Sequence, residues 1–339
     1  MGYPANDNEA NVQVFKNCSL TKGASIISGA KHTNGDLYIG GYVAYTAKKT
    51  PMQFLGCHNH ATMATTSSAS ATEDLCVGSY IGWKGGGVAT FKGCYNDGDI
   101  TVEGKTFKNI YVAGAIAGSS VAQIVKDSAY PYCYNTGEIT VGNKTGDATI
   151  ATTKTCVAGY VAYYTGGAIS SDIANSGTIT VSNVKSPELY VGGVCGHLNK
   201  AGVVDSAAKF TNIGDISVSE VDVPADKIFV GGIVGSTLSP INGAQSHCGI
   251  LAPNNGKAGW VIGDARVSTA LATNCAIGGK YYEWDTENDV WEPKTLPSST
   301  IYNYLYASGK NTDWTGTDNH DGVTHLSTKP SITLAPAQE

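Results

Sequence analysis

The amino-acid sequence predicts an all-β protein, a parallel β-helix (a solenoid) of about seven coils with an aromatic-rich C-terminal cap. Three observations lead to this fold class. A glycine-rich apolar stretch recurs at intervals of 38, 35, 45, 34, 39 and 31 residues, which is typical of repeat architectures. An asparagine turn followed by β-branched residues recurs between these stretches. Only 15% of the 339 residues are charged while glycine contributes 42, so the surface must consist largely of small polar side chains.

The chain divides into three parts by composition. Residues 1–11 are polar and are expected to form a disordered lead-in. Residues 12–279 contain the repeats and are expected to form one continuous solenoid, because each coil of a solenoid contacts only its neighbours. Residues 280–339 lack the repeat and are rich in Tyr and Trp, which predicts a segment that caps the open end of the last coil.

The glycine-rich stretch is clearest at residues 190–196, Tyr-Val-Gly-Gly-Val-Cys-Gly. Ala113 and Ala158 replace the first glycine in two copies and Ser79 replaces the second in another. Small size within a strand is therefore the common requirement, rather than a ligand-binding loop. The copies begin at Tyr38, Cys76, Tyr111, Cys156, Tyr190, Phe229 and, in a weaker form, Trp260.

The asparagine turn supplies a second strand to each coil. A glycine two residues after most of these asparagines allows positive φ, and the following Ile-x-Val places two β-branched side chains on one face. Equivalent positions in a solenoid lie one above another, so we expect a structural ladder in which each asparagine amide bonds to the next coil. Its members are Asn59, Asn96, Asn135, Asn175 and Asn212.

A third apolar piece, such as residues 87–91 or 202–204, lies between each glycine-rich stretch and the next asparagine turn. Three strands per repeat favour one coil of a parallel β-helix. A propeller blade would need four antiparallel strands within a similar period.

The nine cysteines follow the repeat. Cys57, Cys94 and Cys133 each stand two residues before an asparagine, while Cys76 and Cys156 begin glycine-rich stretches. We expect reduced thiols that pack as small apolar residues in columns, with disulfides as the alternative. No cysteine or histidine spacing is typical of a metal site, so neither a metal nor a cofactor is expected.

Charge and hydropathy restrict the partners. A net charge of -6 without any cluster of Lys or Arg excludes nucleic acid as an expected partner. No apolar run reaches the ~18 residues of a membrane span. The composition is otherwise that of a secreted protein, so we expect that a leader has been removed from this sequence, the alternative being a cytosolic protein.

The alternation of Asn-x-Gly-x-Ile-x-Val with the glycine-rich stretch is clearest at residues 212–218 and 229–235. It resembles the GLUG-type repeats of bacterial surface proteins, which include adhesin-like proteins of gut Gram-negative bacteria. The resemblance covers residues 12–279. It implies a right-handed β-helix that is extracellular or on the outer-membrane surface, and it transfers no catalytic residue.

Parallel β-helices also resemble polysaccharide lyases and hydrolases. A glycosidase needs two carboxylates about 5 to 10 Å apart across a cleft. Asp99 and Glu138 hold equivalent positions in adjacent repeats, but Thr178 and Asp215 share that column. We therefore expect a solvated turn face there, and we assign no catalytic residue.

Two further features are weak indications of a site. Arg266 is the single arginine of the chain, and no aspartate cluster is evident near it. His58 and His60 alternate onto one face, but no third ligand accompanies them, whereas zinc sites use three or four. Both histidines are expected to be surface or turn residues.

Aromatic side chains recur at the end of the glycine-rich stretch, on the face opposite Tyr42, Tyr80 and Tyr160. Flat rings on a rigid β face stack well on sugar rings, although such rings also pack under loops or against one another. The candidate ligand-binding residues are Tyr45, Trp83, Tyr163 and His197.

The leading hypothesis is a non-enzymatic bacterial cell-surface protein that acts in adhesion or glycan binding through one face of the β-helix. The expected partner is a glycan or a surface protein of a host or neighbouring cell. A polysaccharide-active enzyme, either a lyase or a glycoside hydrolase, is the main alternative, and a purely structural stalk is the third.

Overall fold

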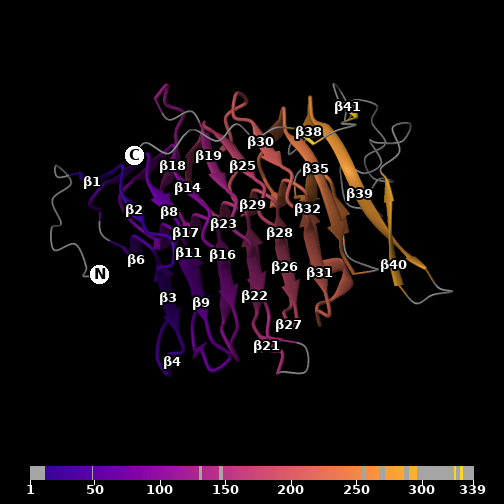
Figure 1. Cartoon of the computed structure of the whole chain (residues 1–339), viewed down its shortest axis with the longest axis horizontal. Helices are drawn as coiled ribbons and strands as arrows, with labels where there is room; N and C mark the ends of the chain where they lie inside the picture. The colour runs from indigo at the N-terminus through magenta and orange to yellow at the C-terminus, as the bar shows by residue number, and fades with distance from the viewer. Residues whose placement is uncertain are drawn as a thin grey trace.

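The computed structural model describes residues 12–47, 49–129, 132–144, 148–253, 257–266, 272–285, 290–295, 324–325 and 329–330. Almost all of them lie in or between short parallel strands that wind into a solenoid (Figure 1). The predicted parallel β-helix is therefore confirmed. Two of its sheets contain seven described strands each, and the chain makes about six turns of the solenoid between the first and the last of these strands. The lead-in predicted for residues 1–11 lies outside the described residues.

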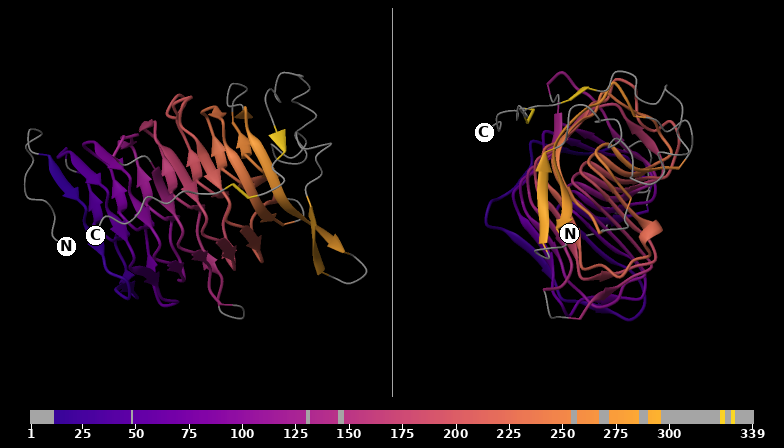
Figure 2. Two further views of the ribbon diagram at one scale, coloured as in Figure 1. Left: turned by 45° about the horizontal axis from the view of Figure 1, so that its top comes forward. Right: turned by 90° about the vertical axis from the view of Figure 1, so that its right-hand side faces the viewer.

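The coils lie one behind another when the solenoid is viewed end-on (Figure 2, right), and the chain passes through sheets that we number 1 to 4 in chain order, although the last coils contribute no strand to sheet 1. Sheet 1 consists of β1 (Gln13–Lys16), β7 (Met52–Leu55), β13 (Ala89–Lys92), β18 (Ala122–Ile124) and β24 (Gly167–Ile169).

Sheet 2 takes two strands from most coils, and β35 (Gln245–Leu251) continues both sets. The first set, which carries the asparagines, is β2 (Ser19–Leu20), β8 (His58–Asn59), β14 (Tyr95–Asn96), β19 (Tyr132–Asn135), β25 (Asp172–Asn175) and β30 (Phe210–Asn212). The second set, which carries the Ile-x-Val pattern, is β3 (Ser25–Ser28), β9 (Thr62–Thr65), β15 (Ile100–Val102), β20 (Ile139–Val141), β26 (Ile179–Ser182) and β31 (Ile216–Ser219).

Sheets 3 and 4 are both formed by the glycine-rich stretches. Sheet 3 consists of β5 (Leu37–Gly40), β11 (Leu75–Gly78), β16 (Asn109–Ala113), β22 (Lys154–Ala158), β28 (Leu189–Gly192), β32 (Ile228–Gly231) and β36 (Lys257–Gly259). Sheet 4 consists of β6 (Val43–Thr46), β12 (Ile81–Lys84), β17 (Ile116–Ser119), β23 (Val161–Tyr164), β29 (Cys195–Leu198), β33 (Val234–Thr237) and β37 (Ile262–Ala265).

Small two-stranded pairs connect the main sheets at the corners of the coils. They are β4 (Lys31–His32) with β10 (Ser70–Ala71), β21 (Ile150–Ala151) with β27 (Val184–Lys185), and β34 (Ile241–Asn242) with β38 (Ala272–Thr273). The helical structure in the described part of the chain is a single 3-10 turn, η1 (Ala225–Lys227), which precedes β32.

Each glycine-rich stretch forms two strands, not the single strand that we predicted. The chain bends at the small residues and passes from sheet 3 into sheet 4. A Cβ on Gly40 would lie 2.1 Å from the carbonyl oxygen of Val43, and a Cβ on Gly231 would lie 1.9 Å from that of Val234, so these copies have no room for a side chain, while Ala113 and Ala158 show that the bend accepts at most a methyl group in others. A coil therefore contains more and shorter strands than the three that the sequence predicted.

The five asparagines lie one above another in sheet 2 and are fully buried. Each Nδ2 donates to the backbone carbonyl two residues later. The same nitrogen also donates to the Oδ1 of the next asparagine, with N–O distances of 2.5 Å from Asn59 to Asn96, 2.7 Å from Asn96 to Asn135, and 2.8 Å for the two later steps that end at Asn212. The buried turn thereby keeps its polar groups bonded.

The bend of the glycine-rich stretch touches this ladder from the inside of the coil. A Cβ on Gly114 would lie 2.4 Å from Oδ1 of Asn135, and a Cβ on Gly159 would lie 2.4 Å from Cγ of Asn175. The second residue of the pair must therefore be small, and the two sides of the coil approach each other closely where these glycines meet the asparagines, which we call the narrow waist.

Beyond Asn212 the ladder ends, and register places Trp260 at the position equivalent to the second glycine. The seventh copy thus starts at Lys257, not at Trp260 as predicted.

Core side chains stack in columns along the axis. The rings of Phe15, Phe54 and Phe91 are stacked with centroid separations of 4.9 and 4.8 Å. These values match the ~4.8 Å between neighbouring strands. Tyr42 lies in the core, on the face opposite Tyr45, and its hydroxyl is 2.7 Å from the carbonyl oxygen of His58. The buried tyrosines thus satisfy their polar ends at the opposite sheet.

All nine cysteines are unpaired, and all except Cys18 are buried. Cys57 belongs to the interior of the coil, as predicted. Cys76 and Cys156 are also buried, but they face outward from sheet 3. They pack as buried, reduced thiols among apolar side chains, as predicted, but on the outer side of the sheet, because alternation along the strand places their neighbours, such as Val77, inside the coil.

One long strand spans the predicted boundary at residue 279. Strand β39 (Ala276–Asp285) pairs in parallel with β35 and with β41 (Thr324–His325), and it forms an antiparallel pair with β40 (Val290–Thr295). The aromatic side chains of this segment lie outside what the structure describes, so the cap remains a prediction.

Replacing Asn135 by alanine should destabilise the protein strongly. The change removes the acceptor of Asn96 Nδ2 and the donor to Asn175 Oδ1, and both atoms are then buried with a missing partner. We expect a loss of about 2 to 5 kcal/mol in the free energy of unfolding, measured by urea denaturation. Thr136→Ala at the adjacent, half-buried position is the control and should cost much less. Equal losses in both variants would contradict the ladder's importance.

Replacing Lys84 by methionine should stabilise the protein at neutral pH. Lys84 is fully buried, its Nζ is 3.3 Å from the Thr50 carbonyl oxygen, and burial lowers its pKa from 10.5 to about 8. The unfolded chain binds the proton more tightly, so wild-type stability should rise with pH between about 8 and 10.5. At pH 7 we expect Lys84→Met to gain about 1 to 3 kcal/mol in urea denaturation.

The advantage of this variant should shrink across the same pH window, because the wild-type lysine then becomes neutral in both states. The exposed residue Lys185 provides a control, and Lys185→Met should have little effect at any of these pH values. A variant at position 84 that is less stable than wild type at pH 7 would show that the buried ammonium group is well solvated by its neighbours.

Candidate functional site

The outward side chains of sheets 3 and 4 meet across the bend and form an aromatic-lined surface, which we call the concave face. Sheet 3 contributes Tyr38, Cys76, Tyr111, Cys156, Tyr190 and Phe229 in coil order. Sheet 4 contributes Tyr45, Trp83, Gly118, Tyr163, His197, Ser236 and Asp264. The four candidate residues predicted from the sequence thus lie in one column, and the column on sheet 3 was not proposed as part of a site.

Rings from the two sheets contact each other across the bend. The centroids of Tyr38 and Tyr45 are 4.7 Å apart, and those of Tyr111 and Tyr163 are 5.1 Å apart. Large and small residues are complementary on this face: a Cβ on Gly118 would lie 2.2 Å from the six-membered ring of Trp83. The rings therefore form a fitted layer, and Tyr45, Trp83 and Tyr163 remain half-buried rather than covered.

His197 differs from the other three candidates because only 1% of it is exposed. Its ring packs edge-on against Tyr190, with centroids 4.4 Å apart. Burial lowers the pKa of His197 to about 4, so the imidazole is neutral at neutral pH. Its Nε2 lies 3.1 Å from Nη1 of Arg266 and must accept the hydrogen bond, because arginine can only donate. His197 thus holds Arg266 in place instead of facing solvent.

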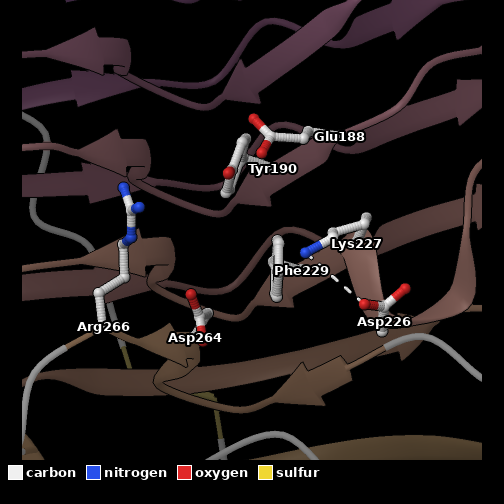
Figure 3. A pocket seen from close by; sticks show the side chains of 7 residues that line it. All are labelled: Glu188, Tyr190, Asp226, Lys227, Phe229, Asp264 and Arg266. Atoms are coloured by element: carbon white, nitrogen blue, oxygen red, sulfur yellow. Dashed lines mark ion pairs between the residues drawn. The ribbon is translucent and has the colours of Figure 1, made fainter.

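A pocket of about 540 Å³ lies where the concave face reaches the last coils. In Figure 3 the rings of Tyr190 and Phe229 lie between two polar walls. Asp264 and Arg266, at the end of β37, form one wall, and the opposite wall comes from the chain just before β28 and from η1. The lining residues are Glu188, Tyr190, Asp226, Lys227, Phe229, Asp264 and Arg266.

Most charges around the pocket are already paired. Lys227 Nζ lies 3.6 Å from Asp226 Oδ2, and Lys154 Nζ lies 3.5 Å from Glu188 Oε2. Arg266 makes no ion pair within the described part of the chain, and its Nη1 is held by His197 and by Asn199 Oδ1 at 3.1 Å. Asp264 has Ser236 Oγ at 3.4 Å. Asp264 and Arg266 are therefore the charged lining residues that take part in no ion pair among the described residues.

This pocket corrects one expectation. The sequence showed no aspartate cluster near Arg266, but Asp226 and Asp264 line the same pocket with it. Asp226 is forty residues earlier in the sequence, and the two meet because successive coils stack. The sequence did contain one signal of this pocket: Asp264 and Arg266 are two residues apart, which places both side chains on the same face at the end of the last strand of sheet 4.

The histidine pair also has partners that sequence reasoning missed. His60 Nδ1 lies 2.6 Å from Asp97 Oδ1, and His60 Nε2 lies 3.2 Å from the hydroxyl of Tyr95. The His58 ring packs on Tyr95 with centroids 3.9 Å apart, and burial lowers the pKa of His58. The group lies on the outer side of sheet 2, away from the concave face.

Other sequence candidates lie apart from the pocket. Asp99, Glu138, Thr178 and Asp215 are all exposed on the turn side of sheet 2. Across the described ranges, no group of three or more His, Cys, Asp or Glu is arranged to hold a metal ion. None of the helical structure described is long and apolar enough to cross a membrane.

Comparison of the chain with protein-family models, with curated proteins and with solved structures finds no match. The resemblance to GLUG-type repeats therefore stays a prediction, and the functional argument depends on the geometry of the face itself.

Replacing Gly118 by alanine should disturb the aromatic layer. The new Cβ would displace the Trp83 ring, so we expect a changed tryptophan emission spectrum and a loss of about 1 to 3 kcal/mol in the free energy of unfolding. Gly85→Ala is the control, because its Cβ would lie 3.4 Å from Nε1 of Trp83, an ordinary contact. In a Trp83→Ala background the Gly118 change should be well tolerated; a persistent cost there would show that the ring is not the obstacle.

Proposed function

We propose that this chain is a non-enzymatic bacterial surface protein that binds glycans on its concave face. The observation that carries the proposal is the row of half-buried rings of Tyr45, Trp83 and Tyr163 on rigid parallel sheets. Aromatic rings on a fixed surface suit the apolar faces of sugar rings. Because neighbouring small residues such as Gly118 already fix the rings, little side-chain entropy is lost on binding.

The pocket supplies the polar contacts that a sugar needs. The carboxylate of Asp264 can accept hydrogen bonds from hydroxyl groups, and the remaining N–H groups of Arg266 can donate to adjacent hydroxyl or ring oxygens. The paired Lys227 and Asp226 on the opposite wall leave little net charge around the pocket, which favours a neutral sugar. We infer that one sugar unit occupies the pocket and that further units extend along the rings of earlier coils.

Location at the cell surface belongs to the same proposal. It is supported by the low content of charged residues and by the resemblance of the repeats to those of bacterial surface proteins. A surface protein of a host or neighbouring cell would then be recognised through its attached glycans.

Polysaccharide cleavage is a second candidate function, favoured by the three carboxylates of the pocket: Glu188, Asp226 and Asp264. Glycoside hydrolysis needs one protonated and one ionised carboxyl group across a cleft. Glu188 and Asp226 each have a lysine within 4.0 Å, so neither carboxyl group stands alone in the pocket as the acid role would require. The pocket therefore suits binding better than acid catalysis.

The proposal is tested on a glycan array and by titration calorimetry with the glycans that bind. Trp83→Ala and Tyr163→Ala should each weaken binding about tenfold or more, because each removes a stacking ring. Tyr132→Ala is the matched control, since Tyr132 is exposed on sheet 2 and should not affect binding.

Two outcomes would overturn the proposal. If the wild-type protein binds no glycan, the aromatic layer serves packing alone. If the bound glycan is recovered with new reducing ends or unsaturated products, and Asp264→Asn abolishes them, the protein is an enzyme.

A further inference from the structure

Four cysteine side chains form a column at the N-terminal end of the solenoid, far in the fold from the pocket. We call Cys18, Cys57, Cys94 and Cys133 the thiol column. Their positions are equivalent, because the residues that follow them are register partners from coil to coil: Ser19 with His58, His58 with Tyr95, and Tyr95 with Tyr134. Neighbouring parallel strands are ~4.8 Å apart, within the range of Cα separations that a disulfide can bridge.

The thiols point along the column toward the preceding coil. Cys57 Sγ lies 3.2 Å from the carbonyl oxygen of Phe15, and Cys94 Sγ lies 3.3 Å from that of Phe54. The thiols of its neighbours in the column, Cys94 and Cys18, both lower the pKa of Cys57. The Cys94 contact is the largest cause that lowers the pKa of Cys57, to about 7, while burial raises the pKa of Cys94. Cys57 therefore ionises more readily than Cys94 and Cys133.

Access to the column decreases from the first coil inward. Cys18 is partly exposed, whereas Cys57, Cys94 and Cys133 are buried. A reagent from solution therefore meets Cys18 first, and the next thiol along the column is Cys57. Among the described residues, the first coil also has a neighbouring coil on one side only, since β1 and β2 are the terminal strands of their sheets.

We propose that Cys18 and Cys57 form a reversible disulfide that links the first coil to the second, by exchange with a small-molecule disulfide. The Cys18 thiolate attacks the disulfide and releases one small thiol, which leaves a mixed disulfide on Cys18. The Cys57 thiolate then attacks the Cys18 sulfur and releases the second small thiol. The two protein thiols are oxidised, the small disulfide is reduced to two thiols, and the protons released pass to the leaving thiolates or to solvent.

The disulfide would fix the edge of the solenoid. In the reduced protein, the first coil is held by hydrogen bonds and side-chain packing to a single neighbour, so local opening should begin there. A covalent link across this edge closes one whole coil of chain and restricts the opened state. The link would suit an oxidising compartment, where such bonds persist.

The test uses the reduced full-length protein, incubated with oxidised glutathione as the probe. The protein is then denatured, alkylated, digested and analysed by mass spectrometry. We expect a peptide pair joined through Cys18 and Cys57, and two fewer alkylated thiols than the nine of the reduced chain. The melting temperature should rise on oxidation and return to its reduced value with dithiothreitol.

Variants separate the proposed pair from other thiols. Cys18→Ser and Cys57→Ser should each abolish both the disulfide and the rise in melting temperature, whereas Cys133→Ser should keep both. Cys18→Ser changes a partly exposed residue, so its fold can be checked by its unchanged melting temperature in the reduced state. A Cys57–Cys94 disulfide, a stable glutathione adduct on Cys18, a dimer linked through Cys18, or nine alkylated thiols would each overturn the proposal.

Discussion

The contact between the asparagine ladder and the bend of the glycine-rich stretch is the constraint on which the shape of the solenoid depends. The amides of Asn135 and Asn175 lie directly beneath Gly114 and Gly159, with no room for a Cβ. Sheet 2 and the junction of sheets 3 and 4 are therefore held together at a narrow waist. The outer surface of that junction must turn inward as a result, and the concave face is the external consequence of an internal hydrogen-bonded column.

The period of the repeat and the chemistry of the asparagine turn were sufficient to predict the parallel β-helix. They were insufficient for the bend, because Gly40 and Gly41 are compatible with a strand interior and with a corner, and the deciding contacts come from neighbouring strands and coils. The same limitation explains Cys76, whose orientation depends on strand alternation before the bend. The column of Tyr45, Trp83 and Tyr163 could be identified because each of these residues holds the same position within its own copy of the repeat. The contact between Arg266 and His197 could not be predicted, since the two residues belong to different coils and to different positions of the repeat.

The concave face combines two properties that usually conflict. Its rings are large and apolar, yet they are held by small residues opposite them, so that they are fixed without being covered. Rigid aromatic surfaces of this kind lose little freedom when a ligand arrives. The buried, neutral His197 contributes in the same sense, because it positions a guanidinium group that has no carboxylate partner in the described chain.

The asparagine ladder has a direction. The amides of Asn59, Asn96, Asn135 and Asn175 all donate toward the C-terminal end, so each internal coil presents an acceptor to the coil before it and a donor to the coil after it. The column begins at Asn59, whose Oδ1 has no partner among the described residues because the equivalent residue of the preceding coil is Leu20. It ends at Asn212, because the equivalent residue of the next coil is Ser246. An internal coil could therefore be duplicated without leaving any amide unmatched, whereas a coil added beyond either terminus would meet a side chain that does not continue the column. The length of such a protein can change in evolution by whole units inserted in the middle.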